Sequence, residues 1–175
     1  MCGRYYSLFD KQQTAELGMQ ERLAPNDWLK KWGPYAEVDA GADIIVMHGA
    51  PLLHGVEIYK GRPIFYDLGN FIYNLPPWLT YIDEPMTWES VVAYVKFQGK
   101  NLQSISFRPI VLNYVGEGQP DIHNAYTNNE FLHTRGLPSP ATGARATYIL
   151  QRLADASKPF GTNVEVSGDM AEIKF

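Results

Sequence analysis

The stretch from residue 41 to residue 73 constrains the fold of this chain most strongly. It begins with a continuous apolar run at residues 44–46, which is typical of a strand buried on both faces in the middle of an α/β sheet. Gly49 and Pro51 stop this run, so we expect His48 where the strand gives way to a loop. Ligands of open α/β sheets collect outside the carboxyl ends of strands, which makes this loop the first candidate for a site.

Three pairs of strand-like runs follow, and a short turn joins the two runs of each pair. The paired runs are residues 56–58 with 63–66, 90–97 with 102–113, and 164–166 with 171–175. Apolar and aromatic runs bounded by turn-forming residues predict antiparallel hairpins. Pro109 marks an edge or a bulge in the second pair, because proline cannot donate to a strand ladder.

One clear helix is predicted over residues 143–157. Thr142 is a good N-cap residue, and Pro159 and Gly161 end the helix. Apolar residues at spacings of three and four give one buried stripe, formed by Ala146, Ile149, Leu150 and Leu153. A buried central strand, antiparallel hairpins and one clear helix together predict an α/β or α+β fold, a sandwich with mixed strand pairing.

The remaining segments are less regular. The first 39 residues show the least coherent pattern, with a short helix flanked by loops expected within residues 23–35. We therefore divide the chain into an atypical N-terminal segment, residues 1–40, and a main domain, residues 41–175. Residues 116–140 are polar and proline-rich, which predicts a long loop with His123 and His133 in solvent.

Composition excludes several classes of protein. A chain of 175 residues can bury the core of one domain without disulfide or metal staples. The net charge of -4 provides no broad surface for nucleic acid. Cys2 is the single cysteine, which excludes an intrachain disulfide and a thiolate zinc cluster. The sequence has neither a signal peptide nor an apolar run of about 18 residues, so we expect a cytoplasmic protein without a transmembrane segment.

Three polar residues of the 41–73 stretch are further candidates for chemistry. Asp67 and Glu57 could form an acid–base pair for hydrolysis. Glu57 alternates with apolar neighbours, however, and is expected to point to solvent. Asn70 follows Gly69 and either caps a turn through its side chain or lines a pocket.

Several blocks of this sequence resemble the CapA family, the poly-γ-glutamate capsule synthesis proteins with a calcineurin-like metallophosphatase-type fold. The blocks are Gly-Ala-Asp at 41–43, His48, Gly-Val-Glu-Ile-Tyr-Lys-Gly at 55–61, Pro-Ile-Phe-Tyr at 63–66, Leu-Gly-Asn-Phe at 68–71, and the end of the chain around 141–143, 149–153 and 159–162. The resemblance covers the main domain and implies the C-terminal half of such a fold. Members of the parent family are often associated with the cell surface.

The resemblance also implies a site with two divalent metal ions, Mn, Fe or Zn, and a polymer or phosphoester substrate. His48 matches the first histidine of a Gly-His-x-x-His loop, and a hydrogen-bonded loop histidine is the alternative for this residue. Pro51 stands at the second histidine and cannot ligate a metal, so His54 is the candidate replacement. His48 and Asn70 are the candidate catalytic residues. The ligands that this family brings from upstream of Gly41 have no counterpart here, and we expect the metal site to be incomplete.

The N-terminus shows a second resemblance. Met-Cys-Gly-Arg-Tyr at residues 1–5 resembles the start of the SOS-response-associated peptidase family. In that family, removal of methionine exposes a cysteine that captures the aldehyde of abasic sites in single-stranded DNA, a role that would fall to Cys2. An N-terminal amine and thiol can close a ring on an aldehyde.

Three functions follow as hypotheses. The chain is a metallophosphatase-type hydrolase of capsule synthesis, a non-catalytic remnant that binds polymer or a partner subunit, or a trap for abasic DNA through Cys2. Under the first two, the chain either needs a missing N-terminal half or forms an oligomer.

Overall fold

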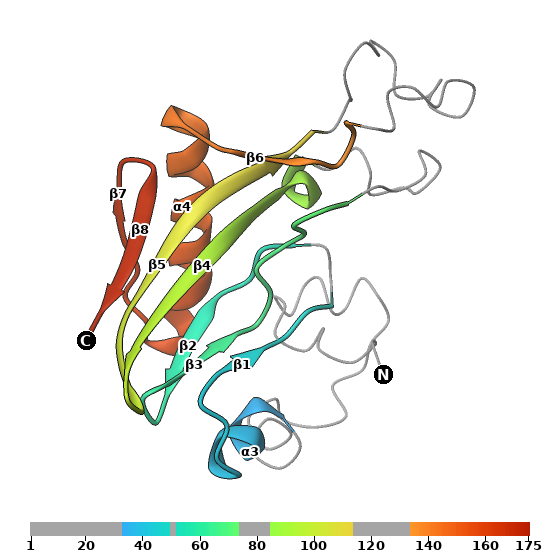
Figure 1. Cartoon of the computed structure of the whole chain (residues 1–175). Coiled ribbons are helices and arrows are strands. Elements are labelled where there is room, and N and C mark those ends of the chain that lie inside the picture. Colours follow the sequence, from blue (N-terminus) through green and yellow to red (C-terminus); the bar gives the residue numbers. More distant parts are fainter. Residues whose placement is uncertain (1–32, 50–51, 74–84, 114–133) are drawn as a thin grey trace.

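The structure, a computed structural model, describes residues 33–49, 52–73, 85–113 and 134–175. It contains a three-stranded sheet of order β1-β3-β2 and a five-stranded sheet of order β4-β5-β8-β7, with β6 paired to β5 (Figure 1). The described helices are α3 (Pro34–Asp39), α4 (Gly143–Ser157) and the 3-10 turns η2 (Pro85–Trp88) and η5 (Lys158–Phe160). None of them is long and apolar enough to cross a membrane. This mixed α+β architecture confirms the predicted fold class.

The small sheet combines parallel and antiparallel pairing. Strand β1 (Ile45–Val46) runs parallel to β3 (Arg62–Phe65), while β2 (Val56–Tyr59) pairs with β3 as the predicted hairpin. The prediction that β1 is buried on both faces is wrong. Val46 is 64% exposed, because β1 is an edge strand that pairs with β3 alone among the described strands.

The large sheet is antiparallel throughout and confirms the other two predicted hairpins. Its strands are β4 (Glu89–Gln98), β5 (Asn101–Leu112), β6 (Pro138–Pro140), β7 (Glu165–Ser167) and β8 (Met170–Lys174). The irregularity of the first pair lies between Lys96 and Phe97. Pro109 lies in β5 between the residues that pair with β8 and those that pair with β6, where its missing N–H is tolerated.

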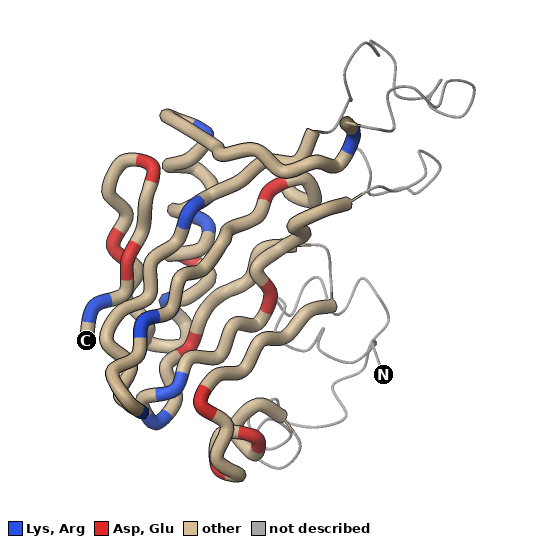
Figure 2. Tube along the Cα trace, viewed as in Figure 1, with Lys and Arg blue, Asp and Glu red and all other residues tan. Residues whose placement is uncertain are grey.

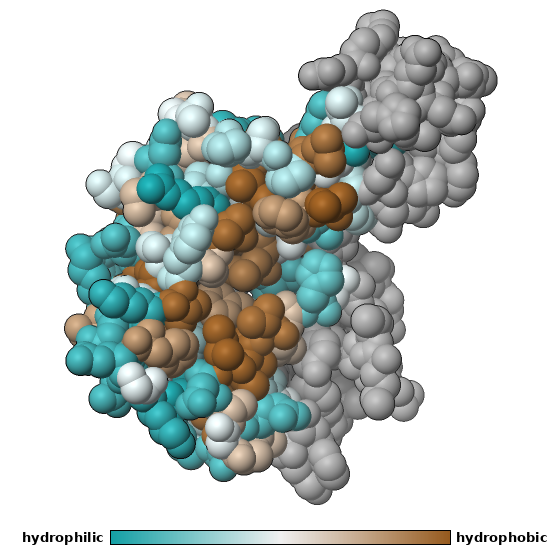
Figure 3. Space-filling model, viewed as in Figure 1, coloured by the Kyte–Doolittle hydropathy of each residue, from teal (hydrophilic) through white to brown (hydrophobic). Residues whose placement is uncertain are grey.

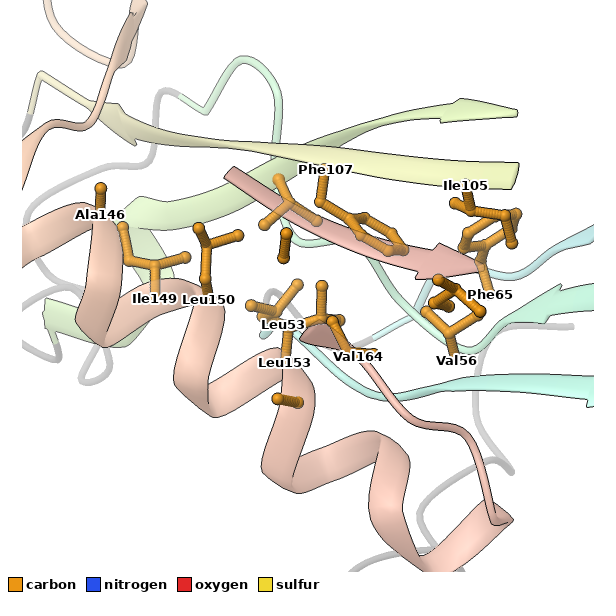
Figure 4. Packing of buried hydrophobic residues seen from close by; sticks show 14 of the residues in the cluster. Leu53, Val56, Phe65, Ile105, Phe107, Ala146, Ile149, Leu150, Leu153 and Val164 are labelled. Atoms are coloured by element: carbon orange, nitrogen blue, oxygen red, sulfur yellow. The ribbon is translucent and has the colours of Figure 1, made fainter. Parts of the chain in front are cut away.

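Helix α4 covers the core and confirms the predicted stripe. In Figure 1 it passes behind strands β4 and β5. All four stripe residues are buried, and they pack against side chains of both sheets, such as Phe65 and Phe107 (Figure 4). Burying a large aliphatic or aromatic side chain contributes about 1.5–3 kcal/mol, so this cluster is the main source of stability. Thr142 occupies the N-cap position, but Asp169 rather than Thr142 accepts the hydrogen bond of the Gly143 N–H, at 2.8 Å.

The C-terminal end of α4 lies against the backbone where β2 begins. A Cβ atom on Gly55 would lie 2.2 Å from the Ala156 carbonyl oxygen, so only glycine fits there. The Ser157 hydroxyl accepts the Val56 N–H at 3.0 Å and donates to the Leu153 carbonyl at 2.7 Å. These contacts fix the helix against the small sheet.

The opposite face of the strands carries mixed polarity. Figure 2 shows basic and acidic residues interspersed over this face, and Figure 3 shows apolar side chains gathered near its middle. Among the described residues, exposed large apolar side chains include Val46, Phe71, Ile72 and Tyr94. The first three belong to β1 and the segment after β3, beside the loop that holds His48.

A buried carboxylate ties α4 to β4. Glu89 is 1% exposed and forms ion pairs with Arg152 and, at 2.5 Å, with Arg145. Burial raises the pKa of Glu89, and the charges of the two arginines oppose that rise. The two guanidinium groups each lie 5.7 Å from the Tyr148 ring, but Arg152 is 20% exposed and Arg145 49%.

The unequal exposure of the two arginines predicts unequal costs of removing them. Arg152→Met should lower the free energy of unfolding by about 2 kcal/mol, because it leaves the buried carboxylate less compensated. Arg145→Met, the matched control, should cost about 0.5 kcal/mol because its partner interaction is solvent-screened. Urea denaturation of both variants measures the difference.

The cost of Arg152→Met should also depend on pH. Loss of Arg152 raises the pKa of Glu89 further, so protonation relieves the uncompensated charge as the pH falls. The stability difference from the wild type should therefore shrink between pH 8 and pH 5. Equal losses of unfolding free energy in both variants would contradict this account of the Glu89 ion pairs. So would a stability difference between Arg152→Met and the wild type that grows at low pH.

Candidate functional site

The centre of the candidate site is the buried carboxylate of Asp67. This residue is 1% exposed, and its carboxylate accepts the N–H of Gly49 at 2.9 Å and of Gly69 at 2.8 Å. The Nδ1 atom of His48 lies 3.1 Å from Asp67 Oδ1. A buried carboxylate requires such partners, since an uncompensated one would be strongly destabilising.

Parallel strand pairing brings these residues together. Met47 follows β1 and donates its N–H to the Phe65 carbonyl at 2.8 Å, which extends the β1–β3 ladder. Because β1 and β3 run in the same direction, the residues after each strand meet at one edge of the sheet. His48 therefore lies beside Asp67, and the prediction that His48 sits where the strand gives way to a loop is confirmed.

The turn after Asp67 packs tightly onto β4. Gly69 has φ +79°, and a Cβ atom there would lie 2.8 Å from the Glu89 carbonyl oxygen. The Leu68 carbonyl accepts hydrogen bonds from the Ser90 hydroxyl at 2.7 Å and from the Val91 N–H at 3.0 Å. Both the left-handed backbone and the close approach require glycine at this position.

Asn70 and His48 line the same open groove. The groove has a volume of about 610 Å³, and its other lining residues come from β1, from the segment 68–72 and from β4. Asn70 is 7% exposed, and its Nδ2 donates to the Thr87 carbonyl at 3.3 Å. The side chain of Asn70 therefore joins the turn to η2 rather than capping the turn itself, and Asn70 also contributes to the lining of the groove.

His54 lies on the other side of Asp67. Its backbone N–H donates to the Asp67 carbonyl at 2.9 Å. Burial lowers the pKa of His54, and the charge of Asp67 partly offsets this shift. Burial therefore favours the neutral form of the His54 imidazole. The side chain of His48, in contrast, is 62% exposed to solvent.

The described residues do not by themselves fit the two-metal centre that the resemblance implies. Within the described ranges, no group of three or more His, Cys, Asp or Glu side chains is placed to hold a metal ion. Each ion of such a centre needs several nitrogen or oxygen ligands. A ligand role for His48 and His54 stays a prediction, and it requires ligands from outside the described part of the chain.

Glu57 corrects one expectation. It does not point freely to solvent: its carboxylate accepts the Tyr35 hydroxyl at 2.9 Å and the Tyr66 hydroxyl at 2.6 Å. Burial is the largest cause that raises the pKa of Tyr35 to about 12, and the hydrogen bond to Glu57 is the second. The same two causes raise the pKa of Tyr66. Tyr35 comes from α3, which the sequence pattern did not reveal, and its ring centroid lies 4.4 Å from that of Tyr59 on β2. Glu57 and Asp67 have separate partners and form no acid–base pair in this structure.

Other sequence candidates lie outside the described residues. They are Cys2, Pro51, His123 and His133. The abasic-DNA hypothesis and the effect of Pro51 on a metal site therefore stay predictions. The domain boundary at residue 40 also stays a prediction.

The candidate site combines an exposed histidine with a buried aspartate. Both residues lie just after the parallel strands β1 and β3, at the carboxyl edge of that pair. Residues 15–75 match the family model described as bacterial capsule synthesis protein PGA_cap.

The chain is also similar to individual proteins, two of which carry the name CapA. The uncharacterized protein y4sH of Sinorhizobium fredii (strain NBRC 101917 / NGR234) is 30% identical over 193 residues, which cover 86% of this chain and 39% of that protein. The PGA biosynthesis protein CapA of Bacillus subtilis (strain 168) is 48% identical over 50 residues, or 29% of this chain and 13% of that protein. The capsule biosynthesis protein CapA of Bacillus anthracis is 54% identical over 39 residues, or 22% and 10%.

These matches support the predicted resemblance of part of this chain to the CapA family of bacterial capsule synthesis proteins. It spans only 39% of the length of y4sH and smaller shares of the two CapA proteins. Sequence reasoning missed the contact between Asp67 and His48. The available signal was that each residue follows a strand, but the parallel pairing of those two strands was not evident.

The packing of the 67–70 turn predicts a specific sensitivity to substitution. Gly69→Ala should lower the free energy of unfolding by about 2 kcal/mol, because it adds both backbone strain and a clash with β4. Gly41→Ala is the matched control: Gly41 also has positive φ, but a Cβ atom there meets nothing within 4 Å. Thermal or urea denaturation should show the larger loss for Gly69→Ala, and equal losses would contradict the packing argument.

Proposed function

We propose that this chain carries part of a metallophosphatase-type hydrolase of capsule polymer synthesis, with His48 as a catalytic residue. The observation that supports this best is the placement of His48. Its imidazole is exposed on the lining of the groove, while its Nδ1 atom is held by a buried carboxylate. An exposed imidazole that a carboxylate orients has the geometry of a general acid or base.

The surroundings of His48 agree with binding of an extended substrate. The groove is open and is lined by residues of β1, β4 and the segment 68–72, among them Asn70. The names of two relatives refer to PGA and capsule biosynthesis, so a phosphoester or a polymer such as poly-γ-glutamate is the substrate class that we propose. A divalent metal, if the full protein holds one, needs further ligands from outside the described residues.

A variant series tests this proposal. The purified chain should hydrolyse bis(p-nitrophenyl) phosphate in the presence of added Mn²⁺, and His48→Ala should lower kcat/KM about 100-fold or more. Tyr94→Ala is the control, because Tyr94 is 58% exposed on β4 and lies outside the groove lining. It should retain wild-type activity.

The outcomes separate the alternatives. Wild-type chain that is folded by circular dichroism but inactive with and without Mn²⁺ would contradict the hydrolase and support a non-catalytic CapA-like domain. Activity that survives in His48→Ala would show that the reaction does not depend on His48.

A further inference from the structure

The inference concerns the hydrogen-bonding partners of Asp67. An ionised carboxylate only accepts hydrogen bonds, and Asp67 already accepts the N–H groups of Gly49 and Gly69. The third group that faces this carboxylate is Nδ1 of His48, at 3.1 Å from Oδ1. For this contact to be a hydrogen bond, Nδ1 must carry the proton.

This assignment determines the state of the second ring nitrogen. In a neutral imidazole one nitrogen is a donor and the other an acceptor, and the partner of one nitrogen sets the role of the other. With the proton on Nδ1, the lone pair of His48 is on Nε2. An imidazole uses this lone pair to accept a proton or to bind a metal ion.

The surrounding contacts make Asp67 a rigid support for this arrangement. Its side chain is 1% exposed and is fixed by backbone groups from both sides, Gly49 after β1 and Gly69 in the turn that packs on β4. His48 itself is 62% exposed, and within the described part of the chain the Asp67 carboxylate is the hydrogen-bonding group that faces its ring. Orientation of His48 therefore depends mainly on one buried carboxylate.

We propose that Asp67 is a positioning residue that holds His48 in the Nδ1–H tautomer and leaves the Nε2 lone pair available to a ligand of the groove. The use of that lone pair rests on the proposed function. The tautomer itself does not, and it can be measured without substrate or metal.

The test is long-range ¹H–¹⁵N NMR of the ¹⁵N-labelled chain at pH 8, where an ordinary histidine is neutral. The wild type should show His48 with the proton on Nδ1. In Asp67→Asn the amide group can donate to Nδ1, so the Nδ1–H tautomer should be lost and the proton should move to Nε2. In catalytic triads the same substitution acts through the wrong histidine tautomer.

Glu57→Gln is the matched control. It also replaces a carboxylate that is hydrogen-bonded to side chains, but its partners are Tyr35 and Tyr66. The His48 tautomer should be unchanged in this variant. A wild type with the proton on Nε2 would overturn the proposal, and so would a folded Asp67→Asn with an unchanged tautomer. The wild-type spectrum decides the question even if Asp67→Asn does not fold.

The experiment also separates this inference from the proposed function. If the chain has the Nδ1–H tautomer but no hydrolase activity, the positioning role of Asp67 stands and the hydrolase falls. If the tautomer is Nε2–H while His48→Ala abolishes activity, the hydrolase stands and the positioning role falls.

Discussion

The site depends on one buried carboxylate that joins two backbone segments. Asp67 accepts hydrogen bonds from the loop after β1 and from the turn after β3, and it faces His48. A buried charge is tolerated only when it has such partners, so its hydrogen bonds restrict the loop and the turn to one arrangement. The same turn packs on β4 through Gly69 and Leu68, which connects the small sheet to the large one.

Helix α4 supplies the second connection between the sheets. Its apolar stripe fills the space beside both sheets, its C-terminal end contacts Gly55, and its arginines reach Glu89 on β4. Glu89 follows the same rule as Asp67, because a buried carboxylate requires partners. The difference lies in those partners: Glu89 pairs with arginines and links elements, whereas Asp67 faces an exposed histidine beside a groove.

The sequence was most informative where a local pattern determines the structure. The stripe of α4 and the three hairpins depend on periodicity and turns, and the structure confirms them. The prediction that β1 is buried on both faces was wrong, because the position of a strand at the edge of a sheet is a tertiary property that an apolar run does not encode. The prediction that Glu57 points to solvent was wrong, because α3 supplies the Tyr35 hydroxyl from a segment with no clear sequence pattern.

The candidate site was predictable only in part. The loop and His48 follow from the strand break, and the family follows from the central blocks. The contact of His48 with Asp67 depends on parallel pairing between β1 and β3. In the sequence, β2 lies between these two strands and forms a hairpin with β3. The chain spans 39% of the length of y4sH, and the described residues provide no group of three or more potential metal ligands.

Amide hydrogen exchange at Gly49 and Gly69 tests the central claim most directly. Both glycines lie outside the strands, and the Asp67 carboxylate accepts the N–H of each. If Asp67 organises the site, both amides should exchange much more slowly than in an unfolded chain. Exchange of either amide at the unprotected rate in the folded protein would contradict this account.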